Sequence, residues 1–128
     1  MKILLDTCTF LWIITDAPEL SERARSLFRD PSNDVYLSSV SVWEMMVKHS
    51  LGRLPLPEPP EGFIPAERER HGIEPLPLEE GAVLYLSRLP RFHNDPFDRM
   101  LICQAINHGM TILTPDKLIV QYPVATIW

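Results

Sequence analysis

Short apolar runs and longer helical patterns alternate along the chain. The runs at residues 3–5, 35–37 and 111–113 are continuous, as is typical of strands buried on both faces of a parallel sheet. Residues 124–127 predict one more strand at the C-terminus. The intervening patterns predict helices at residues 9–15, 21–29, 40–51, 65–71, 78–88 and 96–108. Because strands and helices alternate, we expect an α/β fold with helices on both faces of the sheet.

Proline and glycine mark two of the boundaries. Residues 54–60 include four prolines and cannot form a helix, because proline fixes φ and removes a backbone donor. We expect this segment to cross the surface as a stiff connection. Gly109 follows the last predicted helix, at the position where glycine commonly ends one. The 128 residues suffice for one compact core, so we expect a single domain over residues 1–128.

Composition narrows the possible classes of protein. The hydrophobic fraction of 45% argues against disorder. No apolar run approaches the roughly 20 residues that a membrane-spanning helix needs, and Asp6 interrupts the first run too early for a secretion signal. Cys8 and Cys103 form neither a disulfide framework nor a zinc motif, so a reducing cytoplasm is the simplest expectation. The net charge of −5 argues mildly against nucleic-acid binding, although metal ions in an acidic pocket would reverse the local sign that a phosphate meets.

Four acidic residues occupy positions where an ionised side chain is costly. Asp6 ends the first apolar run, and Asp116 follows the run at residues 111–113. Glu44 and Asp98 each fall in the middle of an apolar stripe near the start of a predicted helix. In an open α/β sheet these positions meet at the carboxyl edge of the strands, where ligands bind. We therefore expect the carboxylates to converge, and their missing counter-charge indicates a divalent ion, Mg²⁺ or Mn²⁺.

Each acid also has a local explanation. Glu44 can pair with Lys48 one helical turn later. Residues 95–98 have the composition of a helix start, with a cap, a proline and an acid. Asp116 fits a turn, whereas Asp6 has no evident partner. No single acid identifies a site, but four that converge on one edge support one.

Two further side chains have structural interpretations. Trp43 lies at the margin of the stripe formed by Val40, Val47 and Leu51, and we expect it to anchor the core. His93 lies near the second acidic motif, and we expect it to sit on the surface or to cap a helix.

The order of these motifs resembles that of PIN-domain ribonucleases. Residues 37–44 (Leu-Ser-Ser-Val-Ser-Val-Trp-Glu), continuing to residues 52–54 (Gly-Arg-Leu), resemble the central motif of that family. Residues 93–102 (His-Asn-Asp-Pro-Phe-Asp-Arg-Met-Leu-Ile) resemble its second signature. Residues 4–7 (Leu-Leu-Asp-Thr) and 113–116 (Leu-Thr-Pro-Asp) complete the order. The resemblance covers essentially the whole chain and is closest to the VapC-like toxins of bacterial toxin–antitoxin pairs.

The resemblance implies a three-layer α/β/α sandwich with a mainly parallel central sheet, and an endoribonuclease that depends on Mg²⁺ or Mn²⁺. The catalytic and metal-binding residues that it implies are Asp6, Glu44, Asp98 and Asp116. Among these, we expect Asp6 and Asp98 to be the principal ligands. Asp116 would hold a second or weaker metal ion, and Glu44 would bind metal or orient the attacking water.

The resemblance also implies accessory residues and partners. Asp95 is an additional acid, and Thr114 and Ser39 would form hydrogen bonds to the metal ligands. Besides the RNA substrate, a cognate antitoxin would block the acidic pocket, often with an arginine, whose fork pairs with carboxylates. A homodimer is implied as well. The apolar segment 10–12 (Phe-Leu-Trp) is one candidate surface for it, and packing into the core is the alternative.

Two other classes of function remain open from the sequence. The acids could bind a metal ion or a basic peptide in a non-catalytic interaction module. Alternatively, Asp6 could be the nucleophile of an aspartyl-phosphate phosphotransferase. That class requires a second aspartate two residues later, where this chain has Cys8.

Overall fold

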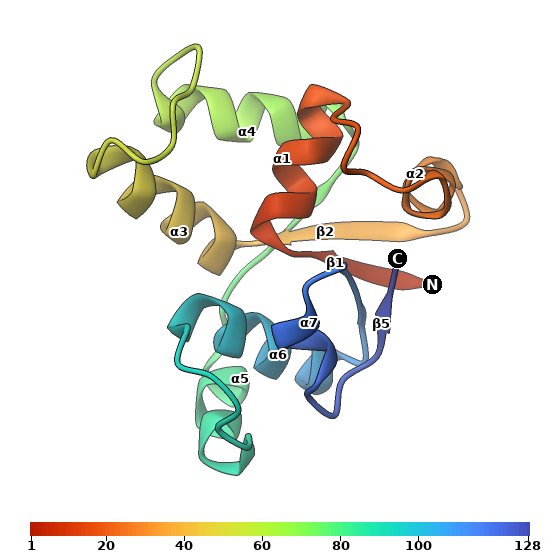
Figure 1. Cartoon of the computed structure of the whole chain (residues 1–128), viewed down its shortest axis with the longest axis vertical. Coiled ribbons are helices and arrows are strands. Elements are labelled where there is room, and N and C mark those ends of the chain that lie inside the picture. The colour runs from red at the N-terminus through yellow and green to blue at the C-terminus, as the bar shows by residue number, and fades with distance from the viewer.

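One five-stranded sheet runs through the middle of the molecule (Figure 1). The computed structural model describes the whole chain, residues 1–128. The strands are β1 (Lys2–Leu5), β2 (Asp34–Ser38), β3 (Glu74–Leu76), β4 (Thr111–Leu113) and β5 (Thr126–Ile127). They lie in the order β3-β2-β1-β4-β5, and every neighbouring pair is parallel. Only β3 was absent from the sequence-based prediction.

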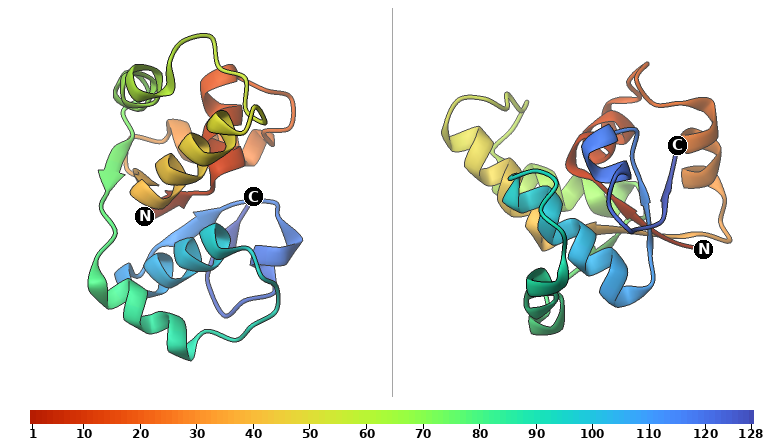
Figure 2. Two further views of the ribbon diagram at one scale, coloured as in Figure 1. Left: turned by 90° about the vertical axis from the view of Figure 1, so that its left-hand side faces the viewer. Right: turned by 60° about the horizontal axis from the view of Figure 1, so that its bottom comes forward.

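Helices cover both faces of this sheet (Figure 2). They are α1 (Thr7–Thr15), α2 (Glu22–Arg29), α3 (Ser39–Ser50), α4 (Pro60–Arg70), α5 (Glu80–Tyr85), α6 (Pro96–His108) and α7 (Lys117–Val120), with a 3₁₀ turn η1 (Leu86–Arg88) after α5. Side chains alternate between the faces: Ile3 and Leu5 join the core under α1, α2 and α4, whereas Leu4 joins the core under α5, α6 and α7. The expected three-layer α/β/α fold is confirmed. No helix of the structure has both the length and the apolar character needed to cross a membrane.

Several element boundaries differ from the predictions, each for a local reason. Strand β3 contains Pro75, which an edge strand tolerates because one side of its backbone needs no partner. Helix α4 begins at Pro60, which suits a first helical position, and then continues through Pro65 instead of starting there. The helix predicted at residues 78–88 is limited to α5 and ends in η1. The short helix α7 was not predicted.

The strand order places a crevice at the carboxyl end of β1. From β1 the chain passes to β2 and β3 on one side, and later returns to β4 on the other side. This reversal is a topological switch point, where open α/β sheets bind their ligands. Leu5 of β1 pairs with Leu113 of β4, so the residues that follow these two strands lie side by side.

Candidate active site

Asp6 and Asp116 are joined at the switch point through a single hydroxyl group. The buried Thr114 hydroxyl donates a hydrogen bond to Asp6 Oδ2, and the backbone N–H of Asp116 donates to the same hydroxyl over 3.0 Å. Asp6 Oδ1 accepts from a backbone N–H in the first turn of α1, and Asp116 Oδ1 accepts from one in α7. Each acid therefore caps the helix that follows it.

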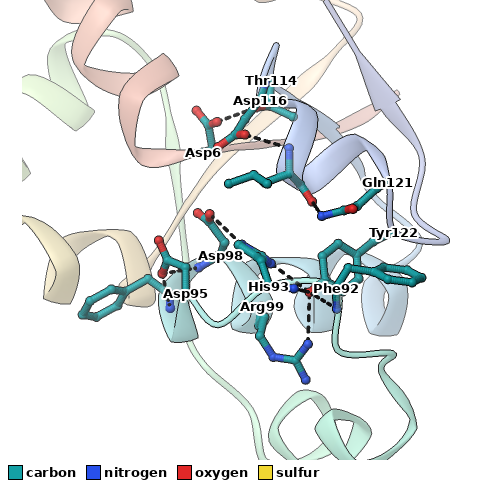
Figure 3. Close-up of polar contacts among 12 residues, drawn as sticks. Asp6, Phe92, His93, Asp95, Asp98, Arg99, Thr114, Asp116, Gln121 and Tyr122 are labelled. Atoms are coloured by element: carbon teal, nitrogen blue, oxygen red, sulfur yellow. Dashed lines mark hydrogen bonds and ion pairs between the residues drawn. The ribbon is translucent and has the colours of Figure 1, made fainter.

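Helix α6 brings two more acids to this edge (Figure 3). Asp95 caps the helix by accepting hydrogen bonds from the backbone N–H groups of Phe97 and Asp98, at 2.9 and 3.2 Å. Asp98 lies in the first turn of α6, and its side chain is 15% exposed. Its only hydrogen-bond partner is His93, with 3.2 Å between Nε2 and Asp98 Oδ2. Asp98 Oδ1 accepts no hydrogen bond.

Glu44 reaches the same region from α3 and is already paired. Its carboxylate is buried and accepts a hydrogen bond from the Thr7 hydroxyl over 2.6 Å. The other oxygen accepts from the Lys48 ammonium, one turn further along α3. The hydrogen bond to Glu44 raises the pKa of Lys48. The local alternative identified from the sequence, an ion pair between Glu44 and Lys48, is therefore present.

The acids are close enough to change one another's ionisation. Burial raises the pKa of Asp6, the hydrogen bonds from Thr114 and Thr9 oppose the rise, and the charge of Asp116 adds to it. Burial also raises the pKa of Asp98, to about 7. The neighbouring carboxylates that add to this rise are Asp95, Glu44 and Asp116. The acids therefore lie within electrostatic reach of one another and leave a local excess of negative charge.

The donor set suits a hard divalent cation, but it does not form a closed cage. Carboxylate oxygens are the ligands that Mg²⁺ and Mn²⁺ prefer. As the side chains stand, no three histidine, cysteine, aspartate or glutamate groups lie together in a metal-binding arrangement. This is compatible with Mg²⁺, which usually keeps several waters and binds one or two protein carboxylates. The free Oδ1 of Asp98 and the raised pKa values of Asp6 and Asp98 fit an acidic site that a cation would neutralise.

Sequence reasoning missed a polar network behind Asp98. His93, expected on the surface or as a cap, has a side chain only 11% exposed, and it contacts Asp98 through Nε2 and the Tyr122 hydroxyl through Nδ1. The buried guanidinium of Arg99 donates to the same hydroxyl over 3.1 Å. Although burial alone would raise it, hydrogen bonding with the side chains of His93 and Arg99 and with the backbone N–H groups of His93 and Phe92 lowers the pKa of Tyr122 to about 8. The sequence signal was the spacing of His93 within the second motif, but nothing in it indicated Tyr122.

Two other side chains lie elsewhere than predicted. Ser39 is exposed at the first position of α3, and its hydroxyl makes no hydrogen bond to the acids. The neighbouring Ser38 is the buried one: it caps α3 and donates to Gln104. The expectation for Trp43 was wrong, since its side chain is 57% exposed and contacts Phe97 edge-on, with ring centroids 4.8 Å apart.

Comparisons with known proteins agree with this architecture. The chain is 33% identical to Ribonuclease VapC16 of Mycobacterium tuberculosis over 63 residues, which is 49% of this chain and 45% of that protein. The match thus spans less than half the length of this relative. Among solved structures, VapBC2 from Rickettsia felis bound to a promoter DNA fragment has a TM-score of 0.75 at 16% identity, covering 100% of this chain and 99% of the other. DNA-bound VapBC from Salmonella typhimurium has a TM-score of 0.72 at 21% identity, covering 99% and 97%.

FitAcB from Neisseria gonorrhoeae has a TM-score of 0.63 at 22% identity, covering 98% of this chain and 96% of the other. At these low sequence identities, the similarity to solved structures establishes only the fold. The family model described as PIN domain matches residues 3–124. Because this match extends over nearly the whole chain, the protein belongs to the PIN domain family.

Proposed function

We propose that this protein is a metal-dependent endoribonuclease of the VapC type, the toxin of a toxin–antitoxin pair. The observation that carries the proposal is the convergence of Asp6, Glu44, Asp98 and Asp116 on the crevice at the carboxyl ends of β1 and β4. The Lys48 ammonium is already bound by Glu44. A site with this excess of negative charge favours the binding of a cation and, once the cation is bound, the binding of a phosphodiester.

Asp6, Asp98 and Asp116 would hold Mg²⁺ or Mn²⁺, and water molecules would complete the coordination. When bound, the ion would supply Lewis acidity toward a phosphate oxygen and lower the pKa of a bound water. Thr114 fixes the direction of the Asp6 carboxylate. Asp98 must lose its proton to bind a cation, which its pKa of about 7 permits near neutral pH. Glu44 lies within electrostatic reach of Asp98 and would orient a water or join the ligands once it separates from Lys48.

RNA is the substrate that best fits the relatives. VapC16 is named a ribonuclease, and the match to it is the sequence link to that activity. The net charge of −5 does not favour a polyanion by itself, so affinity for RNA would depend on the bound cation.

An antitoxin is the protein partner that we propose. The similar structures include VapBC complexes from two bacteria. An antitoxin arginine placed among the acids would neutralise them and exclude the metal ion.

We also propose that the protein forms a homodimer. Within the segment at residues 10–12, Phe10 is fully buried, while Leu11 and Trp12 are half-buried at the edge of the core. Leu84 and Val83 on α5 are 65% and 41% exposed and are better candidates. Sedimentation of the parent and of Leu84→Glu tests this, since the dimer should weaken in the variant.

The two rival functions predict different results. In a non-catalytic module the acids would bind Mn²⁺ without RNA turnover. An aspartyl-phosphate mechanism needs an exposed, free carboxylate oxygen. Both oxygens of Asp6 accept hydrogen bonds and the residue is 5% exposed, which counts against it as a nucleophile.

RNA cleavage assays with Mg²⁺, Mn²⁺ or chelator test the proposal. The parent should cleave a mixture of structured and unstructured RNAs with metal and not with chelator. Asp6→Asn and Asp98→Asn should each abolish cleavage while keeping the parent's circular dichroism spectrum. Asp34→Asn, which removes an exposed acid from the opposite end of β2, is the matched control and should cleave like the parent. Undiminished cleavage by Asp98→Asn, or metal binding without any cleavage, would refute the proposal.

A further inference from the structure

The Tyr122 hydroxyl is the centre of the network behind Asp98. It lies 2.8 Å from His93 Nδ1, 3.2 Å from the backbone nitrogens of Phe92 and His93, and 3.1 Å from Arg99 Nη1. All of these groups belong to α6 or to the segment before it, whereas Tyr122 follows α7. The hydroxyl therefore connects the helix that carries Asp98 to the segment after α7, the helix that Asp116 caps (Figure 3).

The donors and acceptors around this hydroxyl determine which ring nitrogen of neutral His93 carries the proton. Two backbone N–H groups and a guanidinium can only donate, so Nδ1 of His93 is the only neighbouring atom that can accept the phenolic proton. A Tyr122 that is only 3% exposed has little access to water as another acceptor. With Nδ1 accepting, the ring proton lies on Nε2, which faces Asp98 Oδ2 at 3.2 Å.

We propose that Tyr122, held by Arg99, fixes the His93 tautomer, and that His93 is a positioning residue that orients Asp98 for metal binding. The inference rests on the proposed function, in which Asp98 is a metal ligand. His93 holds Oδ2 by hydrogen bonding and leaves Oδ1 free for the ion. Asp98 is thus a metal ligand whose orientation is set by a hydrogen bond from His93. Loss of such a partner typically weakens metal affinity about 10- to 100-fold.

The tautomer can be observed without any activity. In protein labelled with ¹⁵N-histidine, long-range ¹H–¹⁵N spectra distinguish protonated from bare ring nitrogens, and the signals absent from His93→Gln identify His93. A protonated Nε2 together with a bare Nδ1 supports the proposal, whereas a bare Nε2, or protons on both nitrogens, overturns it.

A pair of substitutions at His93 separates positioning from packing. The amide of glutamine reaches the place of Nε2 and can still donate to Asp98, whereas that of asparagine reaches only the place of Nδ1. In calorimetric titrations with Mn²⁺, His93→Asn should bind about 10- to 100-fold more weakly than the parent. His93→Gln should recover most of this loss. His49→Asn, at a histidine of α3 without side-chain hydrogen bonds, is the control and should bind like the parent.

A double-mutant cycle tests the part played by Tyr122. Tyr122→Phe should weaken Mn²⁺ binding about five-fold, as expected for one neutral hydrogen bond. It should have no such effect in the His93→Gln background, because glutamine has no tautomer to fix. Tyr85→Phe, which removes a hydroxyl with no hydrogen-bond partner from α5, is the matched control. An equal effect of Tyr122→Phe in both backgrounds overturns its assigned role. If Tyr122→Phe does not fold, the ¹⁵N-histidine spectra and the comparison of His93→Asn with His93→Gln test the proposal instead.

The same titrations distinguish this inference from the proposed function. If Asp98→Asn binds Mn²⁺ and cleaves RNA like the parent, the proposed function fails. If Asp98→Asn loses both but His93→Asn matches the parent, or if the two His93 variants lose affinity equally, only the positioning inference fails.

Discussion

Neutralising Asp98 should stabilise the metal-free protein at neutral and alkaline pH, even though it should abolish activity. The pKa of Asp98 rises from 3.8 to about 7 on folding, mainly through burial. Each ten-fold change in an ionisation constant corresponds to about 1.4 kcal/mol, so ionised Asp98 lowers the free energy of unfolding by an amount on the order of 4 kcal/mol. Asn has a similar shape and can still accept a hydrogen bond from His93, but it carries no charge.

The sign of this effect sets its pH window. Below about pH 4 Asp98 is protonated in both the folded and the unfolded protein, so the charge penalty is absent. As the pH rises from about 4 through about 7, the unfolded state releases the proton more readily than the folded state, and the stability contributed by the raised pKa is lost. The difference in unfolding free energy between Asp98→Asn and the parent should therefore be near zero at pH 4 and should favour the variant by roughly 2–4 kcal/mol at pH 8.

Urea denaturation in chelator at several pH values measures this difference. Asp34→Asn should remain within about 0.5 kcal/mol of the parent throughout, as surface substitutions usually do. A parent that is as stable as Asp98→Asn at pH 8, or a difference that does not change between pH 4 and 8, would show that Asp98 does not bear the excess charge. Addition of Mn²⁺ should reverse the order at pH 8, because only the parent gains stability from binding.

Three further substitutions test neighbouring contacts. Thr114→Val leaves a buried carboxylate oxygen and a backbone N–H without their shared partner, and it should cost about 1–3 kcal/mol in urea denaturation. Thr111→Val at the start of β4, where the hydroxyl forms no hydrogen bond, should cost less than half as much. Lys48→Met should tighten Mn²⁺ binding by calorimetry, since it removes the cation that occupies Glu44, and unchanged or weaker binding would contradict this. Gly109→Ala should destabilise the protein by about 1 kcal/mol, because φ is +65° where α6 ends; an unchanged denaturation midpoint would exclude that strain.

Elements defined by neighbouring residues could be predicted from the sequence. The bounds of α6 agree at both ends with the prediction, because Asp95, Pro96 and Gly109 supply a cap, a preferred first residue and a left-handed stop. Strand β4 was likewise predicted at its observed bounds. Strand β3 could not be, since a proline at its centre is acceptable only at the edge of a sheet, and the strand order is a property of the whole fold.

The acids of the site could be predicted in part. Asp6, Glu44, Asp98 and Asp116 lie next to apolar positions whose periodicity determines their direction, so their convergence followed from sheet topology. The contact between His93 and Tyr122 could not be predicted, because 29 residues separate them and no periodicity relates them.

The acids differ in how the fold compensates their charges, and this difference identifies where a cation acts. Asp6, Asp95 and Asp116 each accept backbone hydrogen bonds at the start of a helix, so each charge faces a positive helix end. Asp98 accepts none, and it is the carboxylate whose pKa rises to about 7. The backbone hydrogen bonds at these three caps offset part of the negative charge of each acid. Asp98 is the acid whose charge is least compensated by the protein, so its ionisation is the step most tightly linked to the arrival of the ion.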